Sequence, residues 1–148
     1  MPEPVTITNN VEAMRTWLRQ CPSIEQTRLF GVDYLTDEIG YSIRQVPTVR
    51  RTRENILGDT VLQERQEQNF VFESREPYGP DYEQNAENLG VMHAVGAWIV
   101  EQNNARNFPE WEGGDITAVM PTNSPYSMEI GSAFARYQLQ FKVAYRVT

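Results

Sequence analysis

Apolar and polar residues recur along the chain with two different periods, which predict where helices and strands form. A short amphipathic helix is predicted from about Asn9 to Cys21, because its apolar residues follow helical spacing. These residues are Val11, Met14, Leu18 and Cys21. Asn9 or Asn10 is expected to cap the first free amides, and Pro22, which has no amide donor, ends the helix.

The longest helix is predicted after the turn residues 77–80. Asp81 and Gln84 have the spacing of a capping box, in which each side chain bonds a free amide near the other residue. The predicted apolar stripe consists of Tyr82, Ala86, Leu89, His93, Gly96 and Val100, widened by Met92, Val95 and Ile99. We expect this stripe to pack on a sheet, and His93 to be a packed core residue.

Strict alternation of apolar and polar residues predicts the strands. The clearest strand runs from Tyr137 to Val147, with Leu139, Phe141 and Val143 on its buried face. Shorter strands are predicted at residues 29–32, 41–46, 69–76 and 116–119. The fold class is therefore α+β: a mainly antiparallel sheet packed by one short N-terminal helix and one long central helix, in a single domain over residues 1–148.

A polar segment from Thr48 to Glu67 interrupts the strand pattern. We interpret residues 49–72 as an extended hairpin arm, or as two strands joined by a mobile arm, with Gly58-Asp59 as the turn signal. The candidate interface residues on and beside it are Arg50, Arg51, Arg53, Asp59 and Arg65. A solvated charged hairpin is one interpretation; pairing with carboxylates of a neighbouring subunit is a second. A phosphate-contacting patch is a third.

Composition and charge limit the class of protein. The chain has 148 residues, of which 40% are hydrophobic, so it can bury one core and is not disordered as a whole. No apolar run reaches the roughly 20 residues of a membrane helix. The net charge of −7 is opposite to that of a duplex-binding protein. We expect a soluble, intracellular protein.

The sequence contains no specific catalytic, cofactor or metal motif. Its single cysteine, Cys21, and its single histidine, His93, exclude paired thiolate or histidine sites. Acidic pairs such as Asp37-Glu38, and Glu110 with Glu112, are expected by chance among 20 acidic residues. We therefore expect no enzyme and no cofactor. A small enzyme or ligand-binding domain that uses His93 and nearby carboxylates is the alternative.

Four stretches resemble a family of small phage proteins: 72–79 (FESREPYG), 85–90 (NAENLG), 98–103 (WIVEQN) and 135–140 (ARYQLQ). This family is encoded among the head–tail genes of long-tailed, siphovirus-type phages and prophages of Gram-positive bacteria. Its members are often labelled minor capsid or chloramphenicol resistance proteins, and by gene position and layout they are similar to tail terminators or tail-completion proteins.

The resemblance implies a structural protein of the virion, assembled in the host cytoplasm. It implies a hexameric ring that caps the tail tube at the head-proximal end and forms the attachment surface for the head connector. The implied partners are other copies of the chain, the tube protein and the connector, and DNA would pass through the lumen without specific binding. A neck or head-completion protein of the same particle is the alternative. Because of the net charge of −7, we expect an acidic or neutral lumen.

Overall fold

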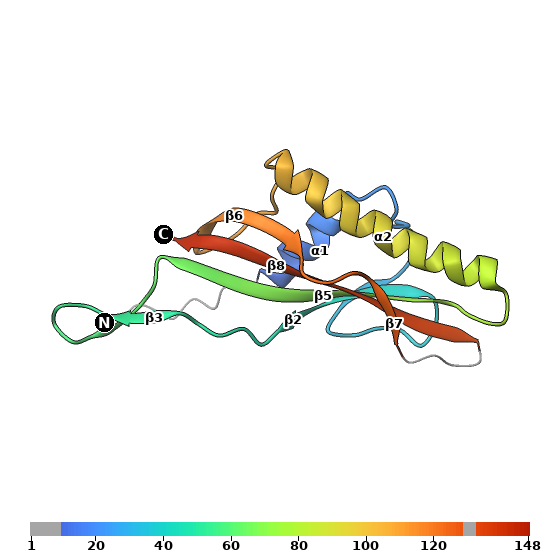
Figure 1. Ribbon diagram of the computed structural model, residues 1–148, viewed down its shortest axis with the longest axis horizontal. Coiled ribbons are helices and arrows are strands. Elements are labelled where there is room, and N and C mark those ends of the chain that lie inside the picture. Colours follow the sequence, from blue (N-terminus) through green and yellow to red (C-terminus); the bar gives the residue numbers. More distant parts are fainter. Residues whose placement is uncertain (1–9, 129–132) are drawn as a thin grey trace.

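The computed structural model describes residues 10–128 and 133–148. Two helices and eight strands follow one another in these residues (Figure 1). Their bounds are α1 Val11–Leu18, β1 Phe30–Val32, β2 Gly40–Val46, β3 Thr52–Glu54, β4 Thr60–Leu62, β5 Arg65–Pro77, α2 Tyr82–Asn104, β6 Gly114–Pro121, β7 Tyr126–Met128 and β8 Phe134–Val147. No helix in the described ranges is long and apolar enough to cross a membrane.

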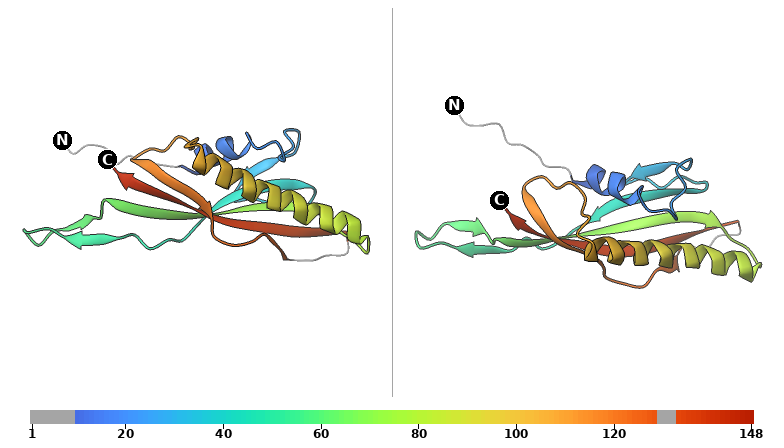
Figure 2. Two further views of the ribbon diagram at one scale, coloured as in Figure 1. Left: turned by 45° about the horizontal axis from the view of Figure 1, so that its top comes forward. Right: turned by 90° about the horizontal axis from the view of Figure 1, so that it is seen from above.

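One sheet forms the body of the molecule, and both helices cover the same face of it (Figure 2). Its strand order is β1-β2-β5-β8-β6, with β7 also paired to β8. The pairs are antiparallel except β1 with β2, which is parallel. The predicted α+β class with a mainly antiparallel sheet is confirmed, as are the short N-terminal helix and the long central helix.

The core lies between the helices and the alternating apolar residues of the central strands. Phe72 on β5 stands opposite Leu139 on β8 and Ile43 on β2, and all three side chains are fully buried. Trp17 of α1 contacts Trp98 of α2 with ring centroids 4.8 Å apart, so the two helices also pack on each other. The predicted burial of Leu139, Phe141 and Val143 is confirmed.

The predicted face of α2 is correct for Met92, Val95, Gly96 and Ile99, which are buried, and wrong for the residues at its margin. Ala86 and His93 are exposed, and Tyr82 is 77% exposed, whereas Leu89 and Val100 are only half-buried. The residues that are buried are Asn88, Met92, Val95, Gly96 and Ile99. Alanine and glycine residues of α2 itself lie on several sides of the helix, so its apolar pattern does not select one narrow face. Gly96 lets α2 pack closely on Leu139 of β8. The methyl carbons of Leu139 would lie 3.7 and 3.8 Å from a Cβ at Gly96.

Both predicted helix caps are only partly correct. Asn10 occupies the N-cap position of α1, but its side chain makes no capping bond; it bonds the backbone of Glu112 instead, accepting from the amide at 3.0 Å. The other candidate, Asn9, lies outside the described residues. Asp81 caps α2 by accepting from the amides of Glu83 and Gln84, but the Gln84 side chain donates to Asn88 rather than returning to the cap.

Candidate functional site: a projecting arm and the open face of the sheet

A two-stranded hairpin projects from one end of the sheet (Figure 1). We call residues 49–63 the arm. Its strands β3 and β4 pair only with each other, with Arg53 opposite Val61. The predicted extended hairpin arm is present, but it is shorter than the predicted residues 49–72, because residues 65–72 belong to β5 and pair with β8 in the main sheet.

A buried glutamine forms hydrogen bonds between the arm and the body. Gln66, on β5, is 3% exposed, and its amide accepts from the backbone N–H of Arg51 at 3.1 Å. The same side chain donates to the carbonyl oxygens of Arg51 at 2.7 Å and of Gln63 at 2.9 Å. Because these bonds connect both arm strands to the sheet, they restrain the direction in which the arm leaves the body.

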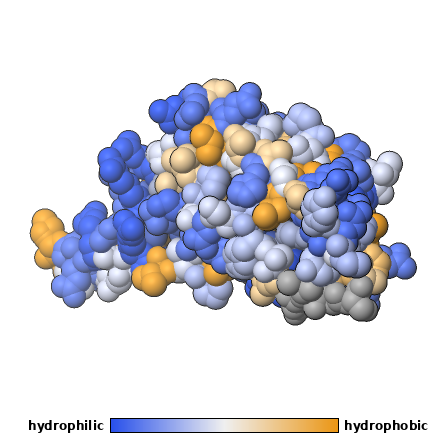
Figure 3. All heavy atoms as spheres, turned by 45° about the vertical axis from the view of Figure 1, so that its right-hand side comes forward, coloured by the Kyte–Doolittle hydropathy of each residue, from blue (hydrophilic) through white to orange (hydrophobic). Residues whose placement is uncertain are grey.

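The far end of the arm is an ordered turn that exposes apolar side chains. The Asn55 side chain accepts from the amides of Leu57 and Asp59, each at 3.0 Å, and Gly58 supplies the positive φ of 83° that the turn requires. Ile56 and Leu57 are 95% and 85% exposed. Hydrophobic atoms are visible at this extremity in Figure 3. A turn that keeps two large aliphatic residues in water is typical of a contact surface.

The five predicted interface residues lie in one region. Arg50, Arg51, Arg53 and Asp59 are all exposed on the arm, and Arg65 is exposed at its base. Arg51 lies 3.7 Å from Glu67 of its own chain, so it has an intramolecular partner. Within residues 10–128 and 133–148, Arg50 and Arg53 form no ion pair.

Two features of the arm were not predicted from the sequence: the exposed apolar residues at its tip and the buried glutamine at its base. Sequence reasoning singled out the charges and passed over Ile56 and Leu57, although these apolar residues immediately precede the Gly58-Asp59 turn. It also treated Gln66 as part of a polar, solvated segment. No local pattern marks Gln66 for burial, because its partner Arg51 lies fifteen residues earlier in the chain.

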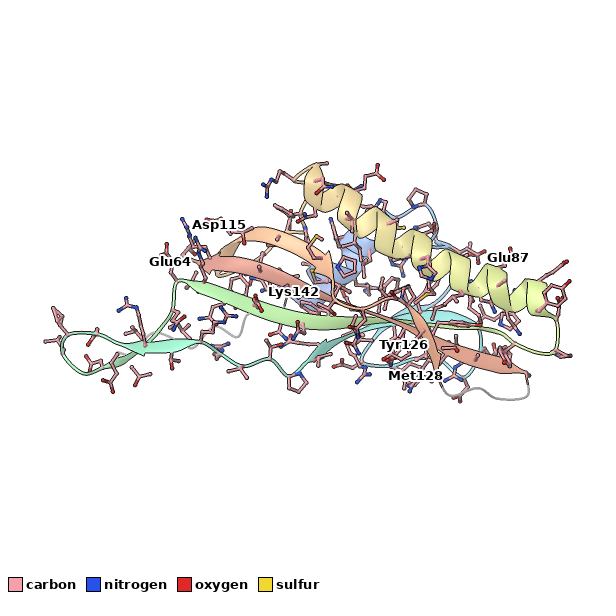
Figure 4. The ribbon with its side chains drawn as sticks, in the orientation of Figure 1. Glu64, Glu87, Asp115, Tyr126, Met128 and Lys142 are labelled. Atoms are coloured by element: carbon pink, nitrogen blue, oxygen red, sulfur yellow. The ribbon has the colours of Figure 1, made fainter. Side chains whose placement is uncertain are left out.

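The charged side chains on the face of the sheet turned away from the helices are mostly basic. Alternation and register place on it Arg44, Arg65, Arg75, Arg136, Lys142 and Arg146, together with the acidic Glu67 and Glu73. Lys142 lies 3.5 Å from Glu67, and Arg146 lies 3.2 Å from Glu64. In Figure 4, Glu64 and Asp115 lie near the arm, and Tyr126 and Met128 lie toward the other end. We call the face of the sheet turned away from the helices the open face.

A buried carboxylate organises the middle of the open face. Glu73 is 4% exposed and accepts from Nε of Arg44 at 3.2 Å and from the side-chain amide of Gln138. Tyr126, on the unpredicted strand β7, donates to Gln138 at 2.8 Å. The sequence assigned Gln138 to a polar, exposed face, which is wrong: this network and β7 leave it 2% exposed.

Most side chains named for the alternative, catalytic function lie on the surface of the described parts of the chain. His93 is exposed on α2, so its predicted place in the core is wrong. Cys21 is 1% exposed, and burial raises the pKa of its thiol. Asp37, Glu38, Glu110 and Glu112 are exposed, and no group of metal-binding side chains forms in the described ranges.

A hollow of about 410 Å³ lies at the base of the arm, lined by Arg50, Leu62, Trp111 and Glu112 among others.

Comparison of the chain with models of known protein families, and with curated proteins, finds no match.

Proposed function

We propose that this chain is a structural protein of a long-tailed phage: a tail terminator that closes the tail tube as a hexameric ring and presents the attachment surface for the head connector. The observation that carries the proposal is the arm. A small domain that holds two large aliphatic residues in water on a clamped hairpin is suited to lasting protein–protein contacts. The phage-family resemblance of the sequence supports the biological setting.

The charge distribution suggests how the ring is oriented around DNA. A channel lined by the open face would hold phosphate groups through salt-dependent contacts and would slow the passage of DNA. The register places six of the 13 basic side chains on the open face, whereas the net charge of the whole chain is −7. We therefore place the open face against the tube or the connector, and an acidic or neutral surface toward the DNA.

Deletion of the gene from a phage that encodes this chain tests the proposal. Without a terminator, tube growth has no stop, so we expect headless tails of irregular length in electron micrographs. A neck or head-completion protein would give a different result: tails of normal length that fail to join filled heads. Full infectivity of the deletion phage would contradict both roles. Binding of duplex DNA by the purified ring at physiological salt would contradict the passive channel.

A further inference from the structure

A second set of exposed apolar side chains lies along β1, the edge strand of the sheet, on both of its sides: Val32 stands opposite the buried Ile43 on the helix side, and Leu29 lies beside Gly40 on the other side. Leu29 and Tyr34 are 56% and 60% exposed, and Val32 and Ile39 are each 38% exposed. All four belong to β1 or to the segments that flank it. Together with Asp33, Asp37 and Glu38 of the following loop, we call these residues the acidic–apolar patch.

The charges of this patch complement those of the arm. Between Asp33 and Ile39 the sequence has three acidic residues and no basic one. In the described parts of the chain, none of these carboxylates forms an ion pair. Arg50 and Arg53 of the arm are equally unpaired, and they lie on the same projection as Ile56 and Leu57. Each surface therefore combines aliphatic side chains with unpaired charge, and the charges are of opposite sign.

The two surfaces do not meet within one molecule. The arm leaves one end of the sheet, whereas β1 and the loop after it lie in the other half of the molecule (Figures 1 and 2). The Gln66 clamp at the base of the arm restrains it from folding back. An arm can therefore reach such a patch only on another copy.

We infer that the arm of one subunit docks on the acidic–apolar patch of the next, with Ile56 and Leu57 against the apolar residues and Arg50 and Arg53 near Asp37 and Glu38. Different surfaces meet in such a contact, so it is head-to-tail, and it closes into a ring when the rotation per subunit permits. The partner is a second copy of the chain, because each copy carries both the arm and the acidic–apolar patch. The inference rests on the ring of the proposed function and names its contact surfaces.

Charge reversal on both sides tests the contact. Arg50→Glu with Arg53→Glu, or Asp37→Arg with Glu38→Arg, should each weaken self-association about tenfold or more, because like charges then face each other. A chain with all four changes should recover the oligomer. Glu83→Arg with Glu87→Arg changes the net charge as Asp37→Arg with Glu38→Arg does, but on exposed positions of α2, and should have no effect. Sedimentation velocity measures the oligomer, and circular dichroism checks folding.

Cysteine pairs test the same contact without altering charge. Leu57→Cys protein mixed with Val32→Cys protein should form a disulfide-linked dimer under mild oxidation, since the native Cys21 is buried. Leu57→Cys mixed with Tyr82→Cys is the control, because Tyr82 is exposed but lies outside the patch.

The outcomes separate this inference from the proposed function. Recovery by the fourfold variant together with the specific cross-link supports it. If the wild-type chain forms a ring, the charge-reversal variants form it equally well and no specific cross-link appears, the docking mode is overturned but the ring is not. Cross-linking of Leu57→Cys to the tube protein instead identifies another occupant and overturns the inference. A wild-type chain that stays monomeric under all conditions overturns both.

Discussion

The side-chain amide of Gln66 holds the backbone of Arg51 from both sides, accepting from its N–H at 3.1 Å and donating to its carbonyl oxygen at 2.7 Å. This pairing imitates one rung of a β-ladder at a point where the arm has separated from the sheet. It connects an otherwise exposed hairpin to the rigid body of the domain.

Gln66→Ala should therefore loosen the arm without unfolding the body. Loss of these buried hydrogen bonds costs about 1–3 kcal/mol, and hydrogen exchange should speed up at the amides of Arg51 and Gln63, which belong to the clamp. Amides of β5 paired with β8 should keep their protection. Gln45→Ala, at an exposed position on β2, is the matched control. Equal exchange of arm amides in both variants would show that Gln66 is no clamp.

The orientation of α2 predicts different costs for two substitutions on one helix. Ile99 is fully buried, so Ile99→Ala should lower the free energy of unfolding by about 2–5 kcal/mol. His93→Ala removes an exposed side chain and should change it by less than about 0.5 kcal/mol. Leu89→Ala, at a half-buried position, should fall between them. Urea unfolding measures all three free energies. A large loss of stability in His93→Ala would show that His93 is a core residue.

A buried ion pair makes stability depend on pH in a defined direction. Arg28 contacts Glu76, and burial raises the pKa of that carboxyl group while the hydrogen bond and charge of Arg28 oppose the rise. Arg28→Met removes the opposing effect, so the pKa of Glu76 should rise further above its value in the unfolded chain. A carboxyl group with a raised pKa in the folded state favours folding at low pH and loses this contribution as the pH rises.

Relative to wild type, Arg28→Met should therefore cost more at about pH 8 than at about pH 5. The loss at the higher pH should be about 3 kcal/mol, as for an uncompensated buried charge. Urea titrations at the two pH values measure the difference. The double variant Arg28→Met with Glu76→Met serves as the control, because it has no carboxylate left at this site to titrate. A cost that is the same at both pH values would contradict this role for Arg28.

The sequence predicts those parts of the molecule whose order is set by local pattern. Leu139, Phe141 and Val143 are buried as their alternation indicates, because β8 is an interior strand between β5 and β6. The face of α2 is predicted only in part: Met92, Val95 and Ile99 are buried as expected, whereas Ala86 and His93 are exposed, because alanine and glycine lie on several sides of the helix. The same holds for the candidate site. The arginines of the arm are visible in the sequence, but the burial of Gln66 and Gln138 depends on partners far away in the chain.

Native mass spectrometry of the purified chain tests the proposed ring, because a ring subunit linked by head-to-tail arms must form an oligomer of one fixed size. We predict a single closed species, a hexamer, that persists on dilution and disappears in the Arg50→Glu, Arg53→Glu variant. A chain that remains monomeric at high concentration, or one that gives a ladder of open oligomers with no preferred size, would contradict the account.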